Sequence, residues 1–181
     1  MKEISLHILD VAENSISAGA KNIEISVVEK SKLDLLQISV KDNGKGMDAE
    51  TAVRIQDPFY TTRTTRRVGL GIPLFKAAAE ACKGGLTITS VPGQGTQVTA
   101  TFQNSHIDRM PLGDLGDTFL TLLIGSPEVG WKLVYARDNR VFEIDSSLIK
   151  EQLEDVPLCD PAVMKWIKEY IREGILDIQN G

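Results

Sequence analysis

Residues 42–47 read D42-N43-G44-K45-G46-M47, an aspartate followed by two spaced glycines. They come directly after the alternating apolar residues of a segment from Leu35 to Val40, a pattern typical of a β-strand. Glycine allows backbone conformations and close approaches that a side chain would forbid. We therefore expect a strand that ends in a loop with another group held beside it.

A helix and a strand are predicted on the N-terminal side of this loop. Apolar residues recur at helical intervals from Ile4 to Ala18, and Gly19 follows where a helix commonly ends in a left-handed cap. Another face of the same helix carries His7, Asp10, Asn14 and Ser17. The alternating residues from Asn22 to Val28 then predict a strand.

The sequence after the loop predicts a short helix, a lid and a second long helix. The short helix covers residues 48–55, with the aspartate at its start as the cap. Residues 57–71 show no periodicity and are rich in Thr and Arg, so we expect a mobile lid. Pro73 suits the first turn of the long helix, which should end at the double glycine 84–85. Two strands follow, Leu86–Ser90 and Thr96–Phe102.

The composition changes near Asn104, where Asn, Asp, Pro and Gly reach the density of a loop. We therefore expect a first domain at residues 1–104 and a small α+β region at residues 105–181. The second region is predicted to hold a short helix, a hairpin and two further helices. The last of these helices should be capped by Asp160 and ended by Gly174.

Composition excludes several classes of protein. The chain has 181 residues, of which 42% are hydrophobic and 25% charged, so it should fold into a globular structure. Its net charge of −5 argues against nucleic acid as the main partner. The sequence has no apolar run long enough to span a membrane and no signal peptide at its start, so we expect a cytoplasmic protein.

Polar groups from separate parts of the sequence point to one ligand. Asn14 can offer a neutral carbonyl oxygen to Mg²⁺, a hard cation that prefers oxygen. Asp42 can accept a hydrogen bond from the exocyclic amine of adenine, while Gly44 and Gly46 let the backbone close against the ring. The run V68-G69-L70-G71-I72 leads into a helix N-terminus, where backbone N–H groups favour phosphate oxygens. Together these groups predict ATP with magnesium.

Four motifs between Ile4 and Phe102 resemble those of the GHKL, or Bergerat-fold, ATP-binding superfamily. This superfamily includes histidine kinases, anti-sigma-factor kinases, mitochondrial protein kinases, type II topoisomerases and MutL. The first motif is the N-box E13-N14-S15-I16-S17-A18-G19-A20, which is similar to that of MutL, and the second is the loop at 42–47. The third is the F-box D57-P58-F59-Y60-T61-T62-R63, which is similar to that of histidine kinases. The last motif is G93-Q94-G95-T96. The resemblance implies an α/β fold, a two-layer sandwich of a mixed sheet with helices on one face, followed here by the small α+β appendage.

The resemblance also implies roles for individual residues. Asn14 would hold Mg²⁺, Asp42 would contact adenine, and Phe59 would anchor the lid. The other residues implied in nucleotide binding are Gly44, Gly46, Met47, Thr61, Thr62, Arg67, Gly69, Leu70, Gly71 and Thr96.

Two departures from the superfamily bear on the reaction. Asp10 stands where catalytic members often carry a Glu that activates the attacking oxygen, and a displacement of about 1 Å can cost on the order of 100-fold in rate. Arg67 stands where many kinases have a glycine, and Arg63 and Arg66 lie nearby in the sequence. These guanidinium groups can supply charge to the γ-phosphate. Asp10 and Arg63 are therefore the candidate catalytic residues.

The preferred interpretation is a Mg-ATP-binding, histidine-kinase-like protein that phosphorylates or regulates a protein partner, and a homodimer is compatible with it. The main alternative is an ATP-gated switch that orders its lid and hydrolyses ATP slowly, without phosphotransfer to protein. A MutL-like repair function rests on the N-box only, and the net charge argues against it. A module with an inactive pocket is the last alternative. Residues 105–181 are expected to recognise the protein partner.

Overall fold

The computed structural model describes residues 2–60 and 70–181. Its elements in chain order are α1 (Ile4–Ser17), β1 (Asn22–Lys30), the short 3₁₀ helix η1 (Ser31–Leu33), β2 (Leu35–Asp42), α2 (Ala49–Arg54), α3 (Gly71–Ala81), β3 (Gly85–Val91), β4 (Gly95–Gln103), α4 (Leu115–Gly125), β5 (Gly130–Arg137), β6 (Arg140–Asp145), α5 (Ser146–Leu153) and α6 (Pro161–Asn180).

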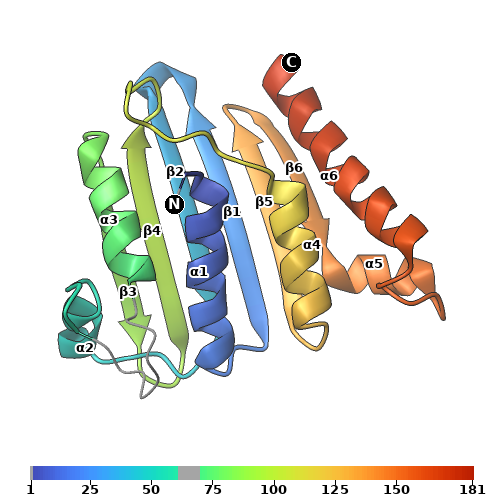
Figure 1. Ribbon diagram of the computed structural model, residues 1–181, viewed down its shortest axis with the longest axis horizontal. Helices are drawn as coiled ribbons and strands as arrows, with labels where there is room; N and C mark the ends of the chain where they lie inside the picture. The colour runs from blue at the N-terminus through green and yellow to red at the C-terminus, as the bar shows by residue number, and fades with distance from the viewer. Residues whose placement is uncertain (1, 61–69) are drawn as a thin grey trace.

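The strands form one six-stranded sheet in the order β3-β4-β2-β1-β5-β6. Neighbouring strands are antiparallel except for β1 and β5, which run parallel. Helices α3, α1, α4 and α6 lie side by side on one face of this sheet (Figure 1). The structure therefore confirms the predicted α/β class, a mixed sheet with helices on one face.

The hydrophobic core lies between the helices and the sheet, and alternation along the strands places the apolar residues there. In β1, for example, Ile23, Ile25 and Val27 are buried, whereas the residues between them are partly exposed. The largest fully buried side chains come from both halves of the chain and include Phe75, Phe102, Phe119, Trp131 and Tyr135. Burying one large apolar side chain stabilises the folded state by roughly 1.5 to 3 kcal/mol. Because these residues come from both halves of the chain, the core stabilises both.

The region after residue 104 continues the sheet. Strand β5 pairs in parallel with β1 from Asn22 opposite Gly130 to Glu29 opposite Arg137. A parallel pair needs a crossover connection, and α4 supplies it by packing on the helical face beside α1. The two regions thus share one sheet and one hydrophobic cluster. The domain boundary near Asn104 stays a prediction.

The last helix is longer than predicted. Asp160 caps it as expected, accepting hydrogen bonds from the backbone N–H groups of Ala162 and Val163, but α6 continues past Gly174 to Asn180. Gly174 is required there for space, because a Cβ at this position would lie 2.2 Å from Cε2 of Phe142. The prediction that Gly174 ends the helix is wrong, since this glycine serves a close approach between α6 and β6.

Replacing each of two helical glycines by alanine should change the free energy of unfolding by different amounts. Gly174→Ala is expected to lower the free energy of unfolding by about 1 to 2 kcal/mol, because the new methyl group overlaps the Phe142 ring. Gly125→Ala, at the end of α4, should change it by less than about 0.5 kcal/mol, because nothing lies within 4 Å of the added Cβ. Urea unfolding of both variants measures the difference. Equal midpoints would contradict the packing of Phe142 on α6.

Candidate functional site

The carboxylate of Asp42 is buried and held in place from two sides. Strand alternation puts this last residue of β2 on the same face as Val40 and Ile38, beneath α1. Ser15 Oγ on α1 donates to Asp42 Oδ2 at 2.6 Å, and the backbone N–H of Gly44 donates to Oδ1 at 2.8 Å. Only 8% of the residue is exposed. A buried carboxylate needs such partners because its desolvation is otherwise costly.

The loop after β2 packs backbone to backbone against the β3–β4 hairpin. Gly46 has a positive φ of 66°, and a Cβ there would lie 2.1 Å from the carbonyl oxygen of Val91. Gly95 has a φ of 124°, and its Cβ would lie 2.0 Å from the carbonyl oxygen of Asp42. Both positions therefore require glycine for space as well as for conformation. This contact holds the 42–47 loop against the turn between β3 and β4, at the start of β4.

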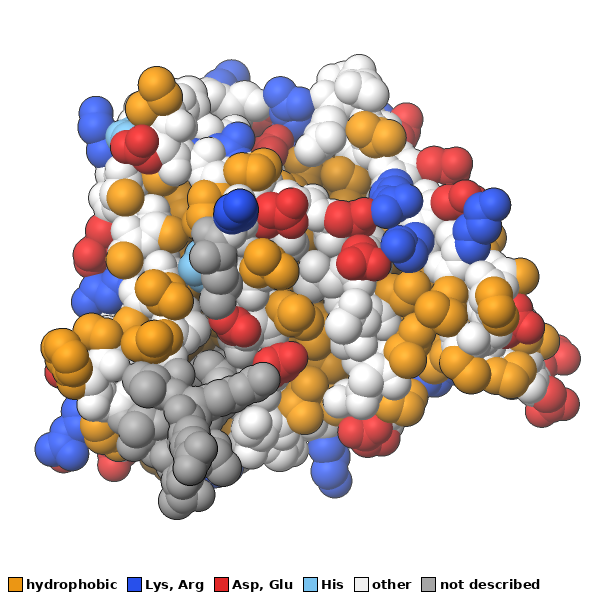
Figure 2. Space-filling view, in the orientation of Figure 1, with side chains coloured by type: hydrophobic (Ala, Val, Ile, Leu, Met, Phe, Trp, Pro, Cys, Tyr) orange, Lys and Arg blue, Asp and Glu red, His pale blue; other side chains and the backbone are white. Residues whose placement is uncertain are grey.

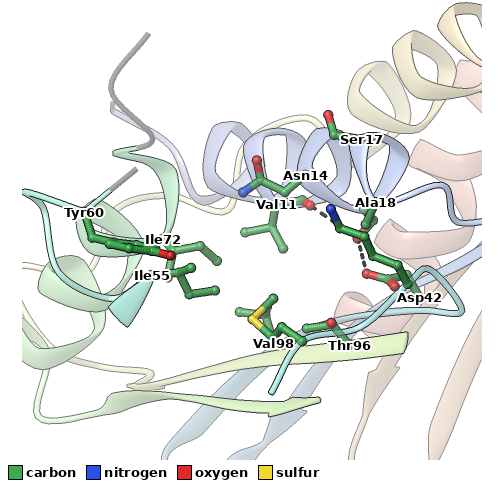
Figure 3. A pocket seen from close by; sticks show the side chains of 13 residues that line it. Val11, Asn14, Ser17, Ala18, Asp42, Ile55, Tyr60, Ile72, Thr96 and Val98 are labelled. Atoms are coloured by element: carbon green, nitrogen blue, oxygen red, sulfur yellow. Dashed lines mark hydrogen bonds between the residues drawn. The ribbon is translucent and has the colours of Figure 1, made fainter. Parts of the chain in front are cut away.

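A pocket of about 320 Å³ opens beside Asp42, between α1 and β4. In Figure 3, Val11 and Asn14 from α1 face Thr96 and Val98 from β4 across it, and Ile55, Tyr60 and Ile72 lie at the end opposite Asp42. The residues that line it are Val11, Asn14, Ser15, Ser17, Ala18, Asp42, Lys45, Met47, Ile55, Tyr60, Ile72, Thr96 and Val98. A mainly apolar wall with a few convergent polar groups is typical of a small-molecule site.

The predicted site residues Asn14, Asp42, Met47 and Thr96 all line this pocket. Met47 and Thr96 are linked through one hydroxyl, since the Met47 N–H donates to Ser90 Oγ at 2.9 Å and Ser90 Oγ lies 2.7 Å from Thr96 Oγ1. Gly44 and Gly46 shape the loop beneath the pocket. Ser15 also lines the pocket, although its contact with Asp42 is not among the predictions from the sequence. A hydroxyl on the otherwise apolar face of α1 was the signal for a buried partner.

Asp10 lies one helical turn before Asn14 and faces the start of α3. Its Cβ is 3.1 Å from the position that a Cβ on Gly71 would take. Leu70 precedes Gly71 as the cap residue of α3 and is partly exposed. An acidic group near a helix N-terminus interacts favourably with the helix dipole. Asp10 itself does not line the pocket.

The lid residues are placed only in part. Phe59 is 93% exposed and does not line the pocket, whereas its neighbour Tyr60 does. The role of Phe59 as an anchor stays a prediction. The other lid residues proposed for the site, Thr61, Thr62, Arg63, Arg66, Arg67 and Gly69, lie outside the described residues.

Residues 2–106, more than half of the chain, match the family of histidine kinase-, DNA gyrase B- and HSP90-like ATPases. The chain belongs to this family. Sensor protein kinase FleS of Pseudomonas aeruginosa is 42% identical over 92 residues, which cover 51% of this chain and 23% of FleS. The signal transduction histidine-protein kinase AtoS of Escherichia coli is 36% identical over 99 residues, which cover 55% of this chain and 16% of AtoS. The chain thus spans less than a quarter of the length of either relative.

A solved structure extends the likeness beyond the ATPase family match. The N-terminal domain of a DNA repair protein superposes with a TM-score of 0.55 at 14% identity, covering 80% of this chain and 52% of that one. At this identity the likeness concerns the fold alone. Because 80% exceeds the share of the chain that matches the ATPase family, part of the region after residue 106 shares this arrangement.

Among residues 2–60 and 70–181, no helix is both long and apolar enough to cross a membrane. Within the same ranges, no group of three or more His, Cys, Asp or Glu side chains could hold a metal ion by itself.

His7 lies in the helical layer of the ATPase domain rather than in the pocket. It is 2% exposed and stacks on Phe75 of α3, with ring centroids 5.0 Å apart. Its Nδ1 atom is buried without a hydrogen-bond partner among the described residues. Burial lowers the pKa of His7 from 6.5 to about 4, because a charged imidazolium is poorly solvated there.

Stability should therefore depend on His7 at acidic pH. Between pH 6.5 and about 4 the unfolded chain binds a proton at this residue that the folded chain does not, so the stabilising effect of neutral His7 is lost as the pH falls. We expect the free energy of unfolding to drop by up to about 3 kcal/mol more in the wild type than in His7→Leu. Urea titrations at pH 7, 5.5 and 4 measure the slope of the free energy of unfolding against pH for the wild type and for His7→Leu. Identical slopes would show that His7 protonates without cost in the folded state.

Proposed function

We propose that the pocket binds Mg-ATP and that the chain uses it to phosphorylate or regulate a protein partner, as a histidine-kinase-like ATPase. The observation that carries this proposal is the buried Asp42 carboxylate, held by Ser15 and Gly44 at one end of the pocket. Membership of an ATPase family supports the choice of nucleotide.

The Asp42 end of the pocket suits an adenine ring. The two carboxylate oxygens have about four acceptor positions, of which Ser15 and Gly44 occupy two, so an exocyclic amine can donate to another. Val11, Ala18 and Val98 provide apolar surfaces for a flat ring. Because the carboxylate is fixed before the ligand arrives, little conformational entropy is lost when it binds.

The other end of the pocket suits phosphates and a divalent cation. Asn14 lines the pocket, and its amide oxygen is a hard, neutral ligand of the kind that Mg²⁺ accepts. Helix α3 begins at Gly71, so its positive N-terminal end lies beside Asp10 and favours anionic oxygens. When bound, Mg²⁺ neutralises charge on the phosphates. These residues fit the predicted cofactor.

Asp10 is the proposed general base for the attacking oxygen, and Arg63 is proposed to supply charge to the γ-phosphate. Asp10 reaches less far than a Glu would, which favours slow turnover. This feature also favours the second candidate function, a switch in which bound ATP changes the conformation and slow hydrolysis reverses it.

Nucleotide affinity should depend on both Asp42 and Ser15. Asp42→Asn is expected to weaken ATP binding by about 100-fold, because an amide donor would face the donor on adenine. Ser15→Ala should weaken it about 5- to 10-fold, because the carboxylate loses one of its two supports. Thr121→Ala is the matched control, since it removes a helical hydroxyl that donates to the Asp117 carbonyl on α4. Calorimetry with ATP and MgCl₂ measures all three. Unchanged affinity in Asp42→Asn would refute the proposed adenine site.

The fate of the γ-phosphate separates the two candidate functions. The full chain is incubated with γ-labelled ATP and Mg²⁺, with and without lysate proteins. Label on a protein is expected for a kinase, and free phosphate alone for the switch. Asp10→Ala should lower either product at least about 100-fold while ATP binding changes little, because the carboxylate acts on the attacking oxygen. Turnover that survives in Asp10→Ala would exclude this residue as the base.

A further inference from the structure

A second cleft lies at the far end of the sheet from the ATP pocket. It has a volume of about 290 Å³ and is formed where β6, α5 and α6 meet. We call it the β6 cleft; its lining residues include Ile144, Leu148, Ile149, Gln152, Trp166 and Tyr170, with Lys132, Glu143 and Asp145 at its polar side. Strand β6 is the outermost strand of the described sheet, so its outer edge is not paired to another strand there.

Aromatic side chains are exposed in this cleft although α6 has a separate buried face. Ile167 and Ile171 turn inward and are 0% exposed, whereas Trp166 and Tyr170 are 43% and 44% exposed. The two exposed rings stack with centroids 5.5 Å apart, and Tyr170 also contacts Phe142 at 5.6 Å. The pair is therefore held in place without being buried. Trp and Tyr in this situation are typical of binding hot spots.

The negative charge of the protein is concentrated in the segment that supplies most of this cleft. Residues 143–181 contain nine Asp and Glu against four Lys and Arg, a net charge of −5 that equals that of the whole chain. Residues 1–142 are therefore neutral overall. Figure 2 shows hydrophobic side chains gathered at the end of the molecule that holds α5 and α6, with both acidic and basic side chains along its margin.

Two of the four cations in residues 143–181 are paired away from the rings. Lys168 contacts Asp117 and Arg172 contacts Asp114, both at the α4 side. Lys132, on β5, lies 3.9 Å from Glu24 and 3.6 Å from Glu143. Lys165 lies 3.9 Å from Glu169, but both side chains are exposed and such a pair contributes little. The exposed flank of α6 thus presents Glu169 and Glu173 next to the aromatic pair.

We propose that the β6 cleft is a docking site for an extended basic segment of a partner protein. An apolar side chain of this segment would occupy the cleft against Trp166 and Leu148, and its Lys or Arg side chains would face Glu169 and Glu173. Charge complementarity selects this occupant, and cation–π contacts with Trp166 add to it. The outer edge of β6 favours an extended backbone. The proposal is independent of ATP binding, which uses the α1–β4 end of the sheet.

The test uses the full chain and two labelled ten-residue peptides, one alternating Lys and Val and the other alternating Glu and Val. Fluorescence anisotropy should show binding of the Lys-Val peptide only, weakened about 10-fold between 50 and 300 mM salt. Trp166→Ala should weaken it at least about 10-fold, and Glu169→Lys about 3- to 10-fold. Glu80→Lys on α3 makes the same change of charge at another exposed helical position and should leave the affinity within about 2-fold.

Several results would overturn the proposal. Binding of neither peptide, or of both equally, would exclude a basic segment as the occupant. Equal affinity in Glu169→Lys and Glu80→Lys would show that net charge alone attracts the peptide. Because Trp166→Ala could disturb α6, urea unfolding accompanies each variant, and Glu169→Lys carries the test if Trp166→Ala unfolds early. A dimer that sedimentation detects in the wild type and not in Trp166→Ala would assign the cleft to a second copy instead.

Discussion

The hydrogen bonds that Asp42 accepts from Ser15 and Gly44 are the constraint on which the pocket between α1 and β4 depends. The bond from Ser15 joins α1 to the end of β2, and together with the buried residues Ile8, Val11 and Ala12 it fixes how α1 is rotated about its axis. With Ser15 directed at the sheet, a helix of 3.6 residues per turn places Asn14 beside the pocket, and Asp10 one turn earlier beside Gly71. One buried carboxylate thus positions both ends of the site.

The parallel pairing of β1 with β5 is the second organising feature. It makes the region that matches the ATPase family and the C-terminal region parts of one sheet, with the Asp42 pocket near β4 and the β6 cleft at the opposite edge. A partner held at β6 would therefore be connected to the Asp42 pocket through the sheet and through the packed row α1, α4 and α6. Such a rigid connection is a physical route for coupling, provided that both sites favour the same arrangement.

Local patterns predicted much of the site. Asn14, Asp42, Met47 and Thr96 were all proposed from motifs, and the structure places them around one pocket. Ser15 and Tyr60 were not proposed. The Ser15 hydroxyl on an apolar helix face indicates a buried partner, but only the structure identifies that partner as Asp42, 27 residues away. Tyr60 lies next to Phe59, and the choice between two adjacent aromatic rings depends on the direction of the chain after α2.

By itself the sequence determined the order and type of most elements and the loop that holds Asp42, because periodicity, caps and glycine positions are local properties of the chain. The tertiary structure decided that β5 lies parallel to β1, that α6 continues through Gly174 beneath the Phe142 ring, and that Trp166 and Tyr170 stand beside β6. The physical reason is that these contacts join residues far apart in the sequence. A strand with an apolar face can pair at either edge of a sheet, and only the packing of the complete core selects one.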